Sequence, residues 1–254
     1  FIRFSDEQKL KTSLQWLGLR PGVTRPSALP AVPIEHGLPP SKKSQGLQVG
    51  KLTHFPAAVV GKLLFLKPSG DTGSCTATFV AGNTLLLTAA ACIADKETGV
   101  NREFVFVSSQ GTEAQQIYDI SCIALPAAWG KTEGPTAWRH NYAFLKTGRS
   151  STFGGLGMTN ALAPRKLSQV GFSDSIGNGV QIQGVDSGAF MTKDKLIGTV
   201  YTALGSGSMG NPWVRNSIIH SITSHYDPEQ PNILLGPRFT SDTMKLLARA
   251  REEC

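Results

Sequence analysis

The amino-acid sequence predicts an all-β fold on three observations. Glycine and proline, which favour turns, number 27 and 15 among the 254 residues. Only 17% of the residues are charged against 40% hydrophobic, so the long charged faces typical of exposed helices are scarce. Short apolar or alternating stretches recur between turn residues, as at residues 75–80 and 85–87, and this pattern is typical of β-strands.

Length, charge and hydropathy exclude several classes of protein. An all-β chain of this length is often one unit. No apolar run approaches the ~18 residues that a membrane helix needs, and the first residues lack the charged-then-apolar order of a signal peptide, so we expect no membrane partner. The net charge of +7 includes +4 from residues 1–50, which contain seven Lys/Arg and three Asp/Glu. The best basic run is only Lys42-Lys43, which excludes a nucleic-acid partner.

Four cysteines, none in Cys-x-x-Cys spacing, argue against a zinc or redox site. Their even number in a glycine-rich β chain favours a secreted, disulfide-bonded protein; four unpaired thiols in a cytosolic protein are the alternative. The sequence also has no set of metal ligands and no glycine-rich phosphate loop between a strand and a helix. We therefore expect neither a metal nor a cofactor.

Residues 1–50 differ from the rest of the chain. Ser5 and Gln8 form a capping-box pattern, and leucines at 10, 14 and 17 share one helix face, which predicts a short helix over about residues 5–17. Six prolines follow, at positions 21, 26, 30, 33, 39 and 40, and such a segment cannot form a core of its own. The sequence predicts a propeptide-like or packing arm, with a plain linker as the alternative.

The remaining elements alternate between strands and turns. Strands are expected at residues 55–63, 75–80, 85–87, 104–107, 117–120, 142–146, 167–172 and 195–201. The chain then ends in a helix capped by Asp242 with Thr240 or Ser241. The apolar side of this helix comprises Met244, Leu246 and Leu247.

Three stretches carry a resemblance to a known family. Residues 85–92 read Leu-Leu-Leu-Thr-Ala-Ala-Ala-Cys, and residues 141–146 read Asn-Tyr-Ala-Phe-Leu-Lys. Residues 184–189 read Gly-Val-Asp-Ser-Gly-Ala, and we expect them to form a turn. They resemble the Thr-Ala-Ala-His-Cys, Gly-Asp-Ser-Gly and Asp-Tyr-Ala-Phe-Leu-Lys motifs of trypsin/chymotrypsin-like serine peptidases. Residues 55–63 resemble the opening strand of the glutamyl-endopeptidase-like branch.

The resemblance implies two six-stranded antiparallel β-barrels with a C-terminal helix and an N-terminal Pro-rich arm. The expected divisions are residues 1–50 for the arm, 51–148 for the first barrel, and 149–254 for the second barrel with the helix. It also implies a Cys75–Cys92 disulfide. Cys122 is left either to pair with Cys254, or unpaired with Cys254 joining two chains.

The resemblance places Ser187 at the nucleophile, Ala91 at the general-base histidine and Asn141 at the triad aspartate. A serine hydroxyl needs a base to take its proton and an acid to orient that base. Alanine accepts no proton, and asparagine carries no charge to stabilise an imidazolium. Loss of the base alone costs about 10⁶ in turnover in a subtilisin-type enzyme, or roughly 8 kcal/mol of barrier.

The other expected site residues surround this triad. By resemblance, the amides of Val185 and Ser187 form the oxyanion hole, although valine replaces a glycine, and Asp186 is structural. The pocket strand provides Val200, Tyr201, Thr202 and Ala203, and Val200 stands where glutamyl endopeptidases carry a histidine. Five histidines are candidates for a replacement base, at positions 36, 54, 140, 220 and 225, and each is better explained as a surface or hydrogen-bonding residue.

The sequence therefore predicts a secreted pseudo-peptidase that binds a protein or peptide partner in the former substrate cleft, with its oligomeric state open. The alternative is a serine endopeptidase captured as an inactivated variant, with Ser187 as nucleophile. A third hypothesis makes residues 1–50 the functional part and the barrels their carrier.

Overall fold

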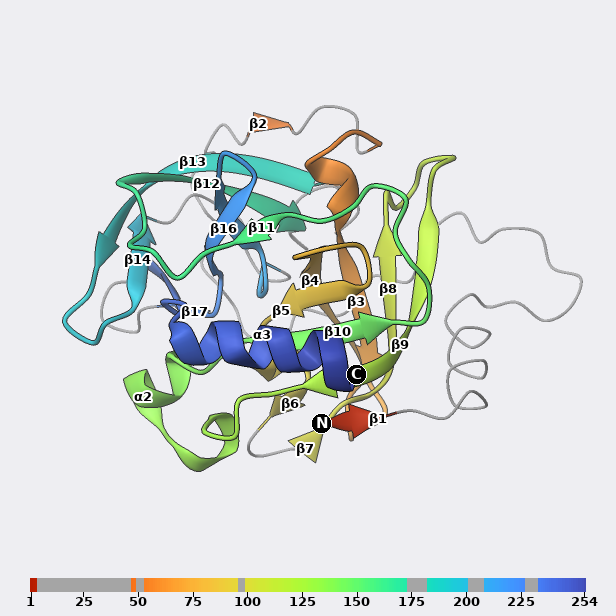
Figure 1. Ribbon diagram of the computed structural model, residues 1–254, viewed down its shortest axis with the longest axis horizontal. Coiled ribbons are helices and arrows are strands. Elements are labelled where there is room, and N and C mark those ends of the chain that lie inside the picture. The colour runs from red at the N-terminus through yellow and green to blue at the C-terminus, as the bar shows by residue number, and fades with distance from the viewer. Residues whose placement is uncertain (4–46, 49–52, 96–98, 173–181, 201–207, 227–232) are drawn as a thin grey trace, which may run out of the picture.

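A computed structural model describes residues 1–3, 47–48, 53–95, 99–172, 182–200, 208–226 and 233–254 (Figure 1). The helix and the Pro-rich stretch predicted for the arm lie outside these residues, as do Tyr201, Thr202 and Ala203. Strands dominate the described chain, and the two main helices are α2 (Gly134–Trp138) and α3 (Ser241–Glu253). The all-β class is confirmed.

The first sheet contains a closed six-stranded barrel. Its order is β9-β10-β5-β4-β3-β8, and β8 pairs again with β9. The members are β3 (Val60–Leu66), β4 (Thr72–Phe79), β5 (Leu85–Thr88), β8 (Arg102–Ser108), β9 (Gln116–Ala124) and β10 (Ala143–Thr147). Fully buried Phe79, Phe106 and Tyr118 fill its interior, with Phe79 packed edge-on against the other two rings. Such aromatic packing stabilises beyond the buried area alone.

Among the described residues the second sheet is not closed into a barrel, so the second six-stranded barrel is not confirmed. Its order is β11-β16-β15-β12-β13-β14-β18-β17, with β2 on β13. The ladder is interrupted at Thr223 and Ser224, where Thr223 bonds to Asn211 and Ser224 to Leu235. The members are β2 (Leu47–Gln48), β11 (Gly157–Met158), β12 (Lys166–Phe172), β13 (Ile182–Met191), β14 (Ile197–Val200), β15 (Pro212–Arg215), β16 (Ile218–Ile222), β17 (His225–Tyr226) and β18 (Ile233–Gly236).

Short elements complete the chain between these strands. They are η1 (Ala57–Val59), η2 (Ala90–Cys92), β6 (Ala94–Asp95), β7 (Gly99–Val100) and η3 (Trp129–Lys131). Of these, η2 bears most directly on function because it follows β5 and holds Ala91.

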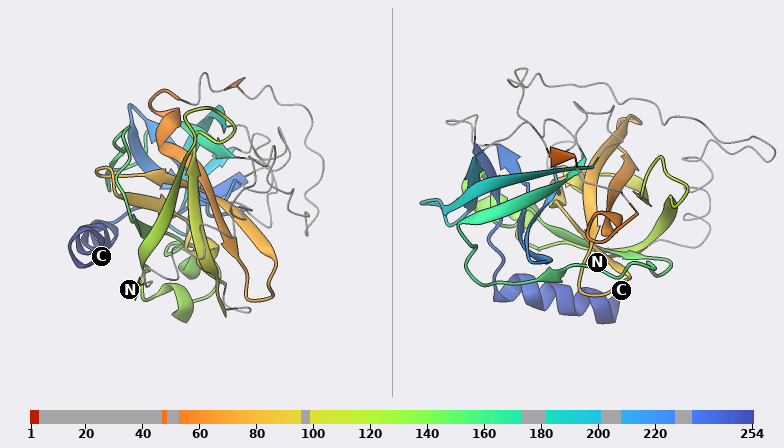
Figure 2. Two further views of the ribbon diagram at one scale, coloured as in Figure 1. Left: turned by 90° about the vertical axis from the view of Figure 1, so that its right-hand side faces the viewer. Right: turned by 90° about the horizontal axis from the view of Figure 1, so that it is seen from above.

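Both termini are fixed to β9. The strand β1 (Ile2–Arg3) pairs Ile2 with Ile123 and Arg3 with Cys122, and Cys122 forms a disulfide with Cys254, the first of the two expected alternatives. Figures 1 and 2 show the two ends side by side, with α3 running across the sheets. At the start of α3, Thr240 forms a capping box with Thr243. Thr240 was one of the capping residues expected from the sequence.

The two sheets meet through a shared core. Phe172, at the end of β12, is fully buried in the same apolar cluster as the first-barrel side chains. Its amide donates to Thr76 Oγ1 on β4 over 3.1 Å, and the amide of Thr76 donates to the Met209 carbonyl over 2.9 Å. The end of β12 at Phe172 therefore faces the first barrel, and its other end, at Lys166, points away.

Candidate functional site

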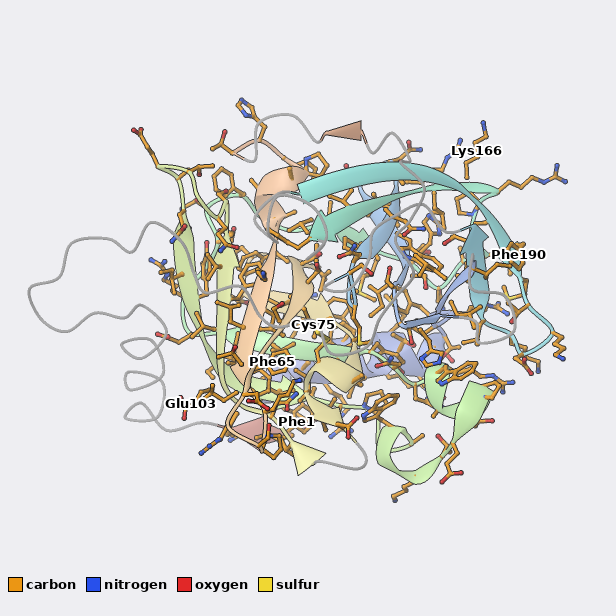
Figure 3. The ribbon with its side chains drawn as sticks, turned by 180° about the vertical axis from the view of Figure 1, so that it is seen from behind. Phe1, Phe65, Cys75, Glu103, Lys166 and Phe190 are labelled. Atoms are coloured by element: carbon orange, nitrogen blue, oxygen red, sulfur yellow. A yellow bond between two sulfur atoms is a disulfide. The ribbon has the colours of Figure 1, made fainter. Side chains whose placement is uncertain are left out.

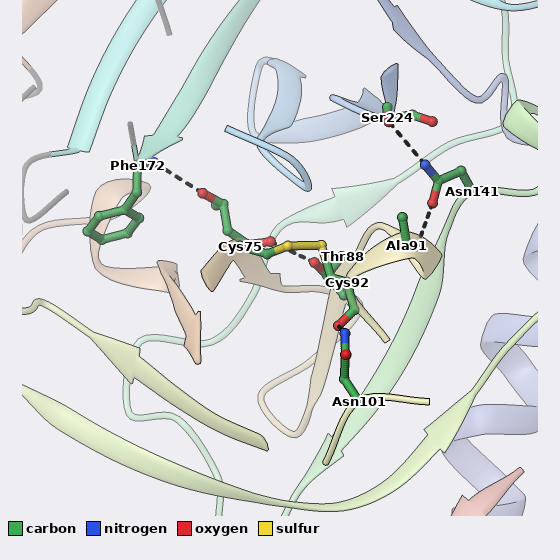
Figure 4. Close-up of a disulfide and its surroundings, with 9 residues drawn as sticks. Cys75, Thr88, Ala91, Cys92, Asn101, Asn141, Phe172 and Ser224 are labelled. Carbon is green, nitrogen blue, oxygen red and sulfur yellow. Dashed lines mark hydrogen bonds between the residues drawn. A yellow bond between two sulfur atoms is a disulfide. The ribbon is translucent and has the colours of Figure 1, made fainter. Parts of the chain in front are cut away.

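The short helix η2 presents Ala91 beside the junction of the two sheets. Every residue of β5 is buried, and the chain turns into η2 as soon as this apolar run ends. Cys92 is bridged to Cys75 on β4, so η2 is tied to the barrel in the way that the resemblance implies (Figure 4). The disulfide and the buried strand together fix the backbone around Ala91, whose side chain is half-buried.

Asn141 uses both ends of its side chain to join three segments. Its Oδ1 accepts from the Ala91 amide over 2.8 Å, and its Nδ2 donates to the Ser224 carbonyl over 3.0 Å. Only 2% of the residue is exposed. Since Ser224 also binds Leu235 through its amide, one neutral side chain connects η2, the start of β10 and the interruption of the second sheet. The structure thus brings together two of the three residues that the resemblance assigns to the triad.

The chemistry of Asn141 differs from that of a carboxylate. An ionised carboxylate accepts hydrogen bonds only, whereas the contact with Ser224 requires a donor. The amide therefore matches its surroundings in a way that an aspartate would not. It provides no charge to Ala91, and alanine has no group to transfer a proton.

Ser187 does not lie in the turn that the sequence suggested. It lies in the long strand β13, where its backbone pairs with Leu167 of β12. Leu167 is five residues from Phe172, the β12 residue that contacts the first barrel. At 3.3 Å per residue, Ser187 is about 17 Å along the strand from that contact. The strand register does not bring Ser187 to Ala91 and Asn141.

The proposed oxyanion amides lie in the same ladder. The Ala189 amide donates to Arg165 over 2.9 Å, which makes these residues a hydrogen-bonded pair. Such pairs recur at every second residue of an antiparallel ladder. The register then assigns the amides of Ser187 and Val185 to the carbonyls of Leu167 and Gln169. We infer that both amides donate hydrogen bonds within the sheet. Asp186 pairs with Ser168 in the same register.

Another segment, Ser208 to Asn211, does lie beside the pair. The Met209 carbonyl accepts from Thr76, and the Gly210 amide donates to Thr223, the residue before Ser224. Gly210 has φ +86, and a Cβ there would lie 2.1 Å from the Thr76 carbonyl and 2.6 Å from Thr88 Oγ1. Only glycine fits this left-handed, crowded position. Ser208 is buried, and Met209 is the half-buried residue of this turn.

The sequence analysis missed this turn although it contained a signal. Residues 207–210 read Gly-Ser-Met-Gly and precede the apolar pair Pro212-Trp213, which begins β15. A glycine-flanked turn before a buried strand is the same local pattern that drew attention to Ser187. The pattern was not recognised because position 209 holds a methionine, and its thioether is not a catalytic nucleophile.

The described histidines lie at four places in the structure. His140 follows α2, and burial, with a smaller effect of Arg139, lowers its pKa, partly offset by Asp242 of α3. Exposed His54 contacts Thr53, and His36 lies outside the described residues.

Two further histidines lie on the second sheet. Burial, with a smaller effect of Arg215, lowers the pKa of His220. His225 stacks on Trp138, with ring centroids 4.2 Å apart and planes at 23°. His225 follows Ser224 directly, so the Trp138–His225 stack forms one wall of the region around Asn141. Val200, the one predicted pocket residue that the structure describes, ends β14 and pairs with Ile233.

Within the described residues, no three His, Cys, Asp or Glu side chains gather as metal ligands. Nor does that part of the chain contain a helix long and apolar enough to cross a membrane.

Solved structures share this architecture. A thermostable serine protease, AL20, from an extremophilic microorganism is 21% identical, with a TM-score of 0.65 over 78% of this chain and 98% of its own. A Glu endopeptidase is 16% identical, with a TM-score of 0.68 over 82% and 96%. The scabies mite inactivated protease paralogue S-I1 is 14% identical, with a TM-score of 0.57 over 76% and 95%.

No protein-family model and no curated protein matches the sequence. The chain has the chymotrypsin-like serine protease fold. Its structural neighbours include proteases and an inactivated paralogue, so the fold alone does not define an activity. Disulfide bonds in a protein of this fold are typical of secreted proteins.

Proposed function

We propose that this protein is a non-catalytic serine-peptidase homologue that binds a protein or peptide at the site around Ala91. The observation that carries the proposal is the pair of hydrogen bonds made by Asn141 to Ala91 and Ser224. Both functions of a neutral side chain are engaged at the position where peptidase chemistry needs a carboxylate. The site is thus adapted to asparagine.

Catalysis at this site would lack each chemical group that a triad needs. Ala91 cannot remove a proton, and Asn141 cannot stabilise the positive imidazolium that a base would become. Loss of such groups removes about 10⁶ of turnover in a subtilisin-type enzyme. A general base within hydrogen-bond reach of a nucleophile is the first geometric requirement, and alanine at position 91 provides no base.

We further propose that Met209, and not Ser187, stands at the nucleophile position. Met209 belongs to the turn bonded to Thr76 and, through Gly210, to Thr223, whereas the backbone of Ser187 pairs within the β12–β13 ladder. In this proposal all three triad positions are altered. Three independent changes favour a binding protein over an endopeptidase that was inactivated at a single position.

The remaining expectations complete the proposal. We propose that the protein is secreted, since its four cysteines form two disulfides. The division into an arm of residues 1–50, a first half of 51–148 and a second half of 149–254 remains part of the proposal.

Fluorophosphonate labelling followed by mass spectrometry tests the loss of catalysis. We expect no labelling of the native chain, and none of the Ala91→His, Asn141→Asp double variant, because it still lacks a serine at position 209. Adding Met209→Ser should produce labelling at residue 209. Labelling of Ser187 in the double variant would support the original assignment instead, and labelling of the native chain would refute the non-catalytic proposal.

Peptide-display selection tests binding. Peptides selected on the native chain should lose affinity for Ala91→Trp, which fills the site, and keep it for Ala127→Trp, a matched change at an exposed alanine remote in sequence. Equal binding to both variants would show that the peptides bind elsewhere and would contradict the proposed site.

A further inference from the structure

One end of the second sheet carries exposed apolar residues among basic ones. We call it the sheet-end surface and define it by six residues of β12, β13, the residue before β12 and the turn before β14: Arg165, Lys166, Phe190, Met191, Lys193 and Lys195. It lies at the end of β12 opposite Phe172, the residue that contacts the first barrel. All six are exposed.

Phe190 projects outward from the sheet. Its neighbour Ala189 packs against the buried cluster of the second sheet, and successive side chains of a strand point to opposite faces. The Phe190 ring lies over Gly198 of β14, where a Cβ would come within 2.5 Å of it. The far end of the ring thus covers a glycine, yet 43% of the residue is exposed, as is 41% of Met191.

Lys166 shares this outer face. It pairs with Gly188, two residues before Phe190, so the two side chains are diagonal neighbours about 7–8 Å apart. Figure 3 shows both residues at the same edge of the molecule. Glycine at position 188 leaves the space between them open.

The turn between β13 and β14 adds two more positive charges. The Thr192 amide donates to Leu196 over 2.9 Å, which closes the turn and exposes Lys193 and Lys195. Across residues 165–166 and 188–199 the sequence has four basic residues and one acid, Asp194. The Asp194 carbonyl accepts from Arg139 Nε over 2.6 Å, so a fifth cation approaches the turn.

We propose that the sheet-end surface docks on membranes that contain anionic phospholipid. An exposed aromatic side chain with cations beside it matches the boundary between acyl chains and anionic headgroups. A soluble polyanion would engage the cations alone and leave Phe190 without a role. Such peripheral attachment needs no membrane-spanning helix, and it does not depend on the function proposed for the Ala91 site.

Vesicle co-sedimentation tests this inference on the full chain. We expect binding to vesicles of phosphatidylcholine with phosphatidylserine, little binding to phosphatidylcholine alone, and weakening by salt because exposed charges are screened. Each lysine near an anionic surface contributes about fivefold in affinity. The Lys193→Ala, Lys195→Ala variant should therefore lose about 25-fold, and Phe190→Ser should lose at least about threefold because its ring no longer enters the apolar layer.

Matched variants at exposed residues outside the second sheet provide controls. Lys67→Ala with Lys131→Ala removes two exposed cations, and Val100→Ser removes an apolar side chain that is 52% exposed; both should bind vesicles like the native chain. Equal binding to both kinds of vesicle, no binding, or equal losses in the controls would overturn the proposal. If Phe190→Ser binds normally while the lysine variant does not, the surface is a polyanion site and the membrane proposal fails. Denaturant midpoints verify that each variant is folded.

Discussion

The Ala91 amide donates a 2.8 Å hydrogen bond to Asn141 Oδ1, and the same amide side chain donates to Ser224. The buried side chain of Asn141 thus contacts two residues that are 50 and 83 positions away from it in the sequence. Because the side-chain donor and acceptor of Asn141 are both hydrogen-bonded, the surroundings of this residue suit an asparagine.

The first prediction is that Asn141→Asp destabilises the protein. A buried carboxylate would face the Ser224 carbonyl and lose the donor, at a cost of about 3 kcal/mol. Burial raises the pKa of such a carboxyl above its unfolded value, so stability should be greatest at low pH and fall as pH rises through the raised pKa. Denaturant unfolding at pH 4 and pH 7 measures this, with Asn141→Ala as a variant that loses the bonds without adding charge. Greater stability of the aspartate variant at pH 7 would contradict the argument.

The second prediction concerns Gly210, which closes the turn beside the site. Gly210→Ala should cost well over the ~1–2 kcal/mol of left-handed backbone strain alone, because its Cβ meets the Thr76 carbonyl. Gly154 has φ +75 with nothing within 4 Å, so Gly154→Ala isolates the strain. Unfolding free energies of the two variants should differ clearly; equal values would show that the turn has room to move.

Removing either disulfide should destabilise the fold, and the Cys122–Cys254 bond should matter more. It closes a separation of 132 residues against 17 for Cys75–Cys92. The chain-entropy account gives about 4–5 kcal/mol for the longer loop and ~3 kcal/mol for the shorter one. Paired Cys→Ser variants in guanidinium unfolding provide the comparison, and the reverse order would mean that local contacts around η2 dominate.

The fourth prediction is a loss of stability in mild acid. Burial lowers the pKa of His140 and of His220, so the folded protein binds fewer protons than the unfolded chain between those lowered values and about 6.5. Stability is therefore fully present above about pH 6.5 and falls as pH drops through this window. The His140→Asn, His220→Asn variant should flatten the pH dependence between pH 7 and pH 5, and an unchanged slope would assign it to other groups.

Local sequence patterns predicted much of this protein. Apolar runs and turn residues determined the strands around Leu63, Leu86 and Phe144, and the capping pattern at Thr240 located the final helix. These strands and the cap depend on residues close together in sequence, for which side-chain type and spacing are sufficient. The pairing of Ala91 with Asn141, 50 positions apart, was instead implied by the resemblance to the serine-peptidase motifs.

Only the tertiary structure decided which segment lies beside that pair. A glycine-flanked Asp-Ser-Gly was expected to form a turn at Ser187, but its backbone pairs with β12 in a long strand, whereas the turn with Met209 and Gly210 bonds to Thr76 and Thr223. The pairing order of the second sheet was likewise not predictable. Strand register and closure are set by pairings between residues far apart in sequence, and a local pattern carries no information about which partner a strand will find.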